Sequence, residues 1–156
     1  MTLFMMIGIP GSGKSTYAKD MVDNFNNEDR IIDYISRDEV RFSLLKEGDP
    51  YFSRENEVYK IFTNKIKESL KNGHDVIADA THITWGSRHK LMQAIRGIDN
   101  VEIVAIVMNT SYDTCERRNM EREGRACVPT SQLERMWEQF EYPLENEGFE
   151  KILEVI

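Results

Sequence analysis

The sequence contains 156 residues, of which 40% are hydrophobic and 30% are charged, and its formal net charge is −7. A chain of this length folds as one domain, taken here as residues 1–156, and buries roughly two thirds of its unfolded surface. No apolar run approaches the ~20 residues of a membrane span, and the N-terminus has no signal-peptide pattern, so we expect a cytoplasmic protein without a membrane partner. The acidic balance excludes the broad basic surface of proteins that coat nucleic acid, but it permits a small basic pocket for one phosphate-bearing end.

The cysteines and histidines give no sign of a structural metal. Cys115 and Cys127 do not form a metal-type pair, and His74, His82 and His89 lack ligand spacing. We expect reduced thiols, and no obligate protein partner is evident.

The N-terminal segment carries a phosphate-binding motif. An apolar strand over Leu3–Ile7 leads into G-x-x-x-x-G-K-S, which runs from Gly8 to Ser15 and precedes a predicted helix. Glycines let backbone N–H groups approach a phosphate, Lys14 reaches the β- and γ-phosphates, and the Ser15 hydroxyl can ligate Mg²⁺. A chance glycine-rich turn is the alternative, but the strand–loop–helix setting favours a nucleoside triphosphate site. The candidate nucleotide-binding residues here are Gly8, Gly11, Ser12, Gly13, Lys14, Ser15 and Thr16.

The rest of the chain alternates predicted strands and helices. After the strand over 3–7 we expect strands over 31–35, 75–78, 101–108 and 149–156. Helices are expected over 14–25, around 40–45, from an N-cap at Ser53 to residue 72, over 87–95, over 111–123 and around 133–140, with a turn over 24–29. This alternation predicts an α/β fold of the P-loop NTPase, nucleotide-kinase-like type. We expect a five-stranded parallel sheet with helices on both faces and an arginine-bearing lid.

An acid and an arginine follow the second predicted strand, in the segment SRDEVR. Ligands of parallel α/β sheets bind outside the carboxyl ends of the strands, which is where Asp38 and Arg41 lie. A carboxylate there can accept a proton from an attacking hydroxyl, and a guanidinium can hold a substrate phosphate. The alternative is that Asp38 is a helix N-cap and Arg41 a solvated side chain.

A second acid, Asp79, ends the apolar strand VIAD in the manner of a Walker B element. An aspartate at this place can hold Mg²⁺ directly or through water, so Ser15 and Asp79 are the candidate metal ligands. Thr81 and His82 are expected at the mouth of the same site. A helix N-cap or a turn aspartate is the alternative.

The predicted helix over 111–123 carries most of the arginine. Arg118 and Arg122 are four residues apart, on one predicted helical face, and Arg125 follows in the loop. Such arginines can close over a triphosphate, although interleaved glutamates equally suit a salt-bridged surface helix. The aromatic residues Tyr51, Phe52 and Trp85 are expected to pack in the core rather than stack on substrate.

Together these segments resemble the phage-type 5′-hydroxyl polynucleotide kinase domain. The resemblance rests on GIPGSGKST, SRDEVR, VIADATHIT and RRNMEREGRACVP and covers nearly the whole chain. The family usually has Asn where this chain has His82, and this sequence has no phosphatase segment. A looser resemblance extends to zeta-toxin-like small P-loop kinases, which act on small metabolites or nucleotides.

The resemblance implies roles for individual residues. Lys14 and Ser15 would bind the ATP phosphates and Mg²⁺, and Asp38 would be the general base on the acceptor hydroxyl. Arg41 would hold the acceptor phosphate, and Arg122 would reach the donor phosphates. The candidate catalytic residues are thus Lys14, Asp38 and Arg122; the candidate donor-site arginines are Arg118, Arg122 and Arg125; the candidate acceptor residues are Arg37, Asp38, Arg41, Asp79, Thr81 and His82.

The sequence therefore predicts a cytoplasmic kinase that transfers the γ-phosphate of ATP, with Mg²⁺, to the 5′-hydroxyl of a nucleic acid end. One alternative is the same chemistry on a nucleoside, nucleotide or other small molecule. The other is an ATPase or nucleotide-binding protein that transfers nothing.

Overall fold

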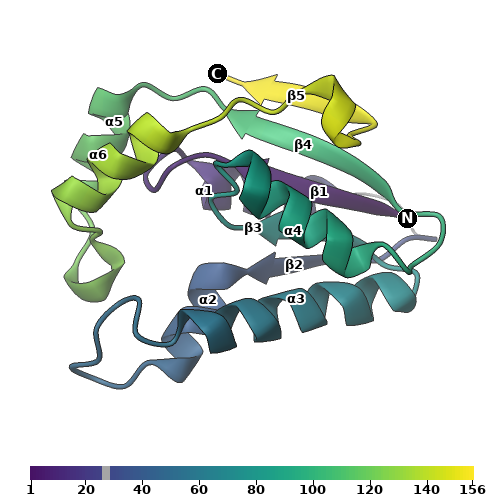
Figure 1. Ribbon diagram of the computed structural model, residues 1–156, viewed down its shortest axis with the longest axis horizontal. Coiled ribbons are helices and arrows are strands. Elements are labelled where there is room, and N and C mark those ends of the chain that lie inside the picture. The colour runs from purple at the N-terminus through teal and green to yellow at the C-terminus, as the bar shows by residue number, and fades with distance from the viewer. Residues whose placement is uncertain (26–28) are drawn as a thin grey trace.

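The fold is built on one parallel sheet, seen in a computed structural model that describes residues 1–25 and 29–156 (Figure 1). Its strands are β1 (Thr2–Ile7), β2 (Ile32–Ser36), β3 (Asp75–Asp79), β4 (Glu102–Met108) and β5 (Lys151–Val155). They lie in the order β2-β3-β1-β4-β5, and every neighbouring pair is parallel. The predicted five-stranded parallel sheet is confirmed, with strand bounds within two residues of the expected ones.

Helices cover both faces of this sheet. The helices are α1 (Lys14–Asn24), α2 (Arg37–Leu44), α3 (Glu55–Lys71), α4 (Trp85–Ile95), α5 (Tyr112–Met120) and α6 (Thr130–Gln139), with short 3₁₀ turns η1 (Gly124–Ala126) and η2 (Glu145–Glu147). α1 packs on one face, α3 and α4 pack on the other, and α2, α5 and α6 gather at the carboxyl ends of the strands (Figure 1). Within the described ranges, no helix is both long enough and apolar enough to cross a bilayer.

Alternating side chains of β1 divide the core into two layers. Leu3, Met5 and Ile7 face the α3–α4 side, whereas Met6 faces α1 and packs near Ala18. The four-residue stripe predicted on α3 is also confirmed: Val58, Phe62, Ile66 and Leu70 are all at most 1% exposed. Burial on both sides explains why the strands read as nearly continuous apolar runs.

Two helix starts differ from the sequence-based expectations. Ser53 is not the cap of α3, because its hydroxyl donates to the carbonyl of Pro50 at 2.7 Å and the helix begins at Glu55. α4 begins two residues earlier than expected, because Thr84 and Ser87 form a reciprocal capping box. The predicted turn over 24–29 includes residues 26–28, which lie outside the described part of the chain.

α5 ends at Met120 rather than at residue 123, and a buried side chain explains why. Asn119, 1% exposed, donates to the Val128 carbonyl at 2.7 Å and accepts from the Val128 N–H at 2.9 Å. These bonds close the segment between them into a loop, and Gly124 adopts a left-handed φ of 58° within it. Arg122 therefore lies in the turn beyond α5, and the expectation of one helical face shared with Arg118 is wrong.

A buried ion pair ties η2, in the C-terminal segment, to α4. Arg88 of α4 is 0% exposed and donates from Nε and Nη2 to Glu147 of η2, at 2.8 and 3.2 Å. Its Nη1 donates to the carbonyl of His82 at 2.9 Å. Because every charged group here is paired, removal of one partner leaves an uncompensated buried charge.

We expect Glu147→Ala to lower the free energy of unfolding by about 3–5 kcal/mol, because Arg88 loses its counter-ion inside the protein. Urea denaturation measured by circular dichroism tests this. The matched control is Glu57→Ala, which breaks an exposed pair with Arg54 and should change stability little. Similar losses in both variants would contradict a special role for the buried pair.

Candidate active site

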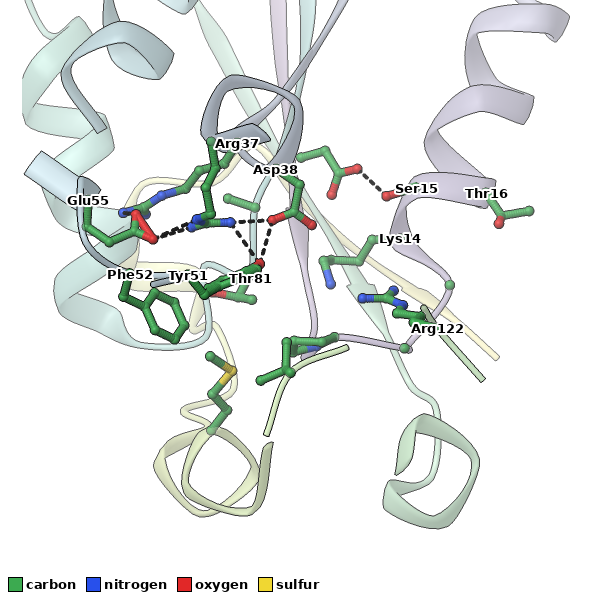
Figure 2. A pocket seen from close by; sticks show the side chains of 18 residues that line it. Lys14, Ser15, Thr16, Arg37, Asp38, Tyr51, Phe52, Glu55, Thr81 and Arg122 are labelled. Carbon is green, nitrogen blue, oxygen red and sulfur yellow. Dashed lines mark hydrogen bonds and ion pairs between the residues drawn. The ribbon is translucent and has the colours of Figure 1, made fainter. Parts of the chain in front are cut away.

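A pocket of about 280 Å³ lies at the carboxyl edge of the sheet. Its walls come from the loop after β1, the start of α2, the segment before α3, the end of β3 and the turn after α5 (Figure 2). The chain segments that carried sequence motifs thus meet in one cavity. This is the edge where parallel α/β proteins bind ligands.

The loop between β1 and α1 has the backbone shape of a phosphate cradle. Gly11 and Gly13 adopt left-handed φ values of 83° and 94°. A Cβ on Gly11 would lie 2.4 Å from the carbonyl oxygen of Cys115, so only glycine fits there. Gly13 is the N-cap of α1, so the helix directs its free N–H groups and positive dipole end into the pocket.

Lys14 is held inside this loop. Its side chain is buried, and Nζ donates to the Ile9 carbonyl at 2.9 Å. Burial lowers the pKa of the Lys14 ammonium, while the negative charges of Asp79 and Asp38 oppose that shift. The Lys14 ammonium can therefore exchange its hydrogen bond with the Ile9 carbonyl for one with a phosphate oxygen.

The predicted nucleotide-binding residues do not all reach this pocket. Gly11, Gly13, Lys14, Ser15 and Thr16 line it.

Gly8 and Ser12 are placed differently. Gly8 donates its N–H to the Thr81 carbonyl at 3.0 Å and lies behind the loop, where a Cβ would meet the Ser12 hydroxyl at 2.5 Å. The Ser12 hydroxyl is itself buried and has no partner among the described atoms, while its carbonyl accepts from Thr110 at 2.8 Å. The structure does not bring Gly8 into contact with the pocket, because its N–H is bound to the segment that follows β3. Ser12 borders a neighbouring pocket.

Asp79 joins the phosphate loop to the sheet. It is 4% exposed, and its Oδ2 accepts from the Ser15 hydroxyl at 2.7 Å and from the Tyr34 hydroxyl at 2.5 Å. Burial and the Asp79 carboxylate raise the pKa of Tyr34, which keeps that phenol a donor. The Ser15 hydroxyl and the Asp79 carboxylate are hard oxygen ligands that lie within hydrogen-bonding distance of each other. This set of donor atoms fits Mg²⁺.

A polar network surrounds Asp38 on the opposite wall (Figure 2). Arg41 is 5% exposed; its Nη1 donates to Asp38 Oδ1 and, at 2.9 Å, to the Tyr51 hydroxyl, which in turn donates to Asp38 Oδ1 at 2.9 Å. The other edge of the Arg41 guanidinium binds Glu55. Ser36 caps α2 by accepting from the Glu39 N–H at 3.2 Å, so Asp38 is not the cap.

Arg37 and Thr81 also line the pocket, but His82 does not. Arg37 donates to Glu55 at 3.4 Å, and Thr81 borders the cavity beside the end of β3. His82 is 6% exposed with a left-handed φ of 45°, and its Nδ1–H donates to the Met6 carbonyl at 2.8 Å. The expectation that His82 lies at the mouth of the site is therefore wrong, because its ring turns into the core.

The arginines after β4 lie at the phosphate loop. Arg118 donates to the Gly11 carbonyl at 3.3 Å. Arg122 lines the pocket, and its side chain extends toward Lys14 (Figure 2). Arg125 belongs to η1, and its side chain lies outside what the structure describes.

Three residues of the site carry no motif in the sequence: Tyr34, Tyr51 and Glu55. A tyrosine within an apolar strand marks Tyr34 weakly, but nothing local marks the other two. The core expectation is wrong for the exposed aromatics, because Phe52 is 39% exposed at the pocket wall and Trp85 is 47% exposed and stacks on His89.

The burial of His82 predicts how the stability of the protein depends on pH. Burial lowers its pKa to about 4, whereas an unfolded histidine titrates near 6.5. As pH falls from about 6.5 to 4 the unfolded chain binds a proton that the folded chain does not, so the free energy of unfolding should fall by up to about 3 kcal/mol. Above pH 6.5 this contribution is constant.

Denaturant titrations between pH 4 and 7 test this with His82→Asn, since asparagine tolerates a left-handed φ and its amide can donate to Met6. The variant should lose that part of the pH dependence, and His89→Asn should keep it. Equal pH profiles for wild type and His82→Asn would refute the assignment.

Comparison with known proteins agrees with this geometry. The chain is 24% identical over 151 residues to a protein named as a bifunctional polynucleotide kinase/RNA ligase of Autographa californica nuclear polyhedrosis virus, covering 88% of this chain and 20% of the relative. It is 26% identical over 130 residues to an adenylate kinase of Nautilia profundicola, covering 77% of this chain and 67% of the relative. The chain thus spans about a fifth of the length of the viral relative.

Solved structures share the fold. Kti12 of Chaetomium thermophilum, solved with ADP-AlF3, superposes with a TM-score of 0.75 at 17% identity and covers 98% of this chain and 88% of its own. The AAA_33 family, described as an AAA domain, matches residues 3–143. The chain has the P-loop fold of these proteins and belongs to the AAA_33 family of AAA domains.

Proposed function

We propose that this protein transfers the γ-phosphate of ATP to the 5′-hydroxyl of a nucleic acid end. One observation carries the proposal: the phosphate loop and the Asp38–Arg41 pair open into the same pocket. Asp38 lies between Lys14 and the Tyr51–Glu55 wall (Figure 2). A donor phosphate on Lys14 and an acceptor hydroxyl on Asp38 would therefore be held in the same pocket, which phosphoryl transfer requires.

The donor half would use groups of fixed position. Lys14 and the N–H groups at the start of α1 would hold the β- and γ-phosphates, and Arg118 would steady the loop that carries them. Ser15 and Asp79 would hold Mg²⁺, which neutralises charge between the phosphates when it is bound. Arg122 would add positive charge beside the transferred group, and Arg125 stays a candidate donor-site arginine.

The acceptor half supports a base role for Asp38. Its Oδ1 is held by Arg41 and Tyr51, and the side chain is 51% exposed toward the pocket. An oriented, ionised carboxylate can take the proton of an attacking hydroxyl, an effect worth typically 10²–10⁴-fold. Phe52 adds an exposed aromatic face of the kind on which bases stack.

A small-molecule acceptor is the second candidate. The net charge of −7 favours it, as does the match to an adenylate kinase, whose acceptor is not a polynucleotide. An ATPase that transfers nothing is the third candidate, since a carboxylate opposite the phosphate loop can also activate a water; the transfer assay below distinguishes it from a kinase.

The first test is transfer of labelled γ-phosphate from ATP to a short 5′-hydroxyl oligonucleotide, compared with a nucleoside pool. Asp38→Asn should lower kcat by at least about 100-fold because the proton acceptor is lost. Asp33→Asn is the matched control, since Asp33 pairs with His74 away from the pocket. Label on the nucleosides alone would favour the small-molecule kinase, and full transfer by Asp38→Asn would remove the base assignment.

The second test concerns Arg122. Arg122→Ala should lower kcat by about 10²-fold, in the range found when one group that stabilises developing charge is removed, and should leave ATP binding largely intact. Arg117→Ala removes an exposed arginine one turn earlier, which does not line the pocket, and should change neither. Steady-state kinetics with calorimetric ATP binding separate the two effects; an unchanged kcat for Arg122→Ala would contradict the role.

A further inference from the structure

The guanidinium edge of Arg41 formed by Nε and Nη2 is already occupied by Glu55. Its Nε and Nη2 atoms lie 2.8 and 2.5 Å from Oε1 of Glu55, while its Nη1 is bound to Asp38 and Tyr51. All three guanidinium nitrogens therefore have partners within the protein. A phosphate can bind the Nε–Nη2 edge only by replacing Glu55.

Glu55 also binds the second arginine of this wall. Its Oε2 accepts from Arg37 Nη2 at 3.4 Å, so its two oxygens bridge two guanidinium groups. The positive charges of Arg37 and Arg41 are thus balanced by the carboxylates of Glu55 and Asp38. The acceptor side is close to neutral as long as Glu55 stays in place.

The bridging carboxylate has the chemistry of a bound anion. The edge formed by Nε and Nη2 is the one through which arginine grips carboxylate and phosphate oxygens alike. Glu55 lines the pocket, its side chain is 24% exposed, and it is the first residue of α3. It can therefore rotate into solvent without breaking a helical hydrogen bond.

We propose that Glu55 is an internal counter-ion in the phosphate subsite of the acceptor, and that a phosphate next to the acceptor hydroxyl displaces it. The inference rests on the proposed function and names a residue that sets its specificity. Arg41 stays hydrogen-bonded to Asp38 through Nη1, while its Nε and Nη2 atoms release Glu55 and bind the phosphate. Glu55 thereby weakens binding of phosphate-bearing acceptors relative to acceptors without phosphate.

Glu55→Gln tests this, because the amide keeps one oxygen for Arg41 but carries no charge. Calorimetry uses protein saturated with Mg²⁺-ADP, so that the phosphate loop is filled, and compares deoxyadenosine 3′-monophosphate with deoxyadenosine. The variant should bind the 3′-monophosphate on the order of tenfold more tightly and the nucleoside unchanged, the scale expected for one charge at a partly exposed site. Unaltered or parallel affinities for the two compounds would overturn the proposal.

Glu57→Gln is the matched control, since it removes the same charge from the same helix but pairs with Arg54 outside the pocket. It should leave both affinities as in wild type, and a tenfold gain there would refute a local effect. Phosphate transfer by the wild type to the same two compounds separates the two claims. Failure of transfer to both counts against the proposed function, while the calorimetric comparison still decides the role of Glu55.

Discussion

The site depends on two hydrogen bonds that fasten the phosphate loop to the end of β3 and to the segment that follows it. The Gly8 N–H donates to the Thr81 carbonyl, and the Ser15 hydroxyl donates to Asp79. The segment after β3 is itself fixed, because His82 donates to Met6 of β1 and its carbonyl accepts from buried Arg88. A loop rich in glycine would otherwise be flexible, so its order comes from neighbours on the sheet rather than from its own sequence.

The two halves of the pocket are built in different ways. The phosphate cradle of the donor half is local, because β1, the loop after it and the start of α1 supply the backbone N–H groups, Lys14 and Ser15. Asp79 and the arginines after β4 complete this half from other parts of the chain. The acceptor half is tertiary, since α2 provides Asp38 and Arg41, the segment before α3 provides Tyr51, and the start of α3 provides Glu55. The packing of α2 on α3 brings these pairs together.

The division between local and tertiary features also explains which features could be predicted. Apolar periodicity was sufficient for the parallel sheet and for the buried stripe of α3, because burial on a regular element leaves a regular pattern. The roles of Tyr51 and Glu55 could not be predicted, since each depends on a partner ten or more residues away. The early end of α5 depends on Asn119 binding the backbone of Val128, and the burial of His82 depends on a carbonyl of β1. Such contacts leave no periodic pattern in the sequence, so they could not be predicted from it.

The arginines around the pocket have different charge environments, and this difference fits two different tasks. Arg41 is buried and bound to two carboxylates, so its position is fixed before any substrate arrives. Arg122 is exposed and, within the described ranges, has no ion pair. A fixed, balanced arginine suits recognition of an acceptor, because an anion must compete for it and poor competitors are rejected. An unpaired arginine at the phosphate loop suits charge that grows during transfer, because no internal carboxylate has to be displaced first.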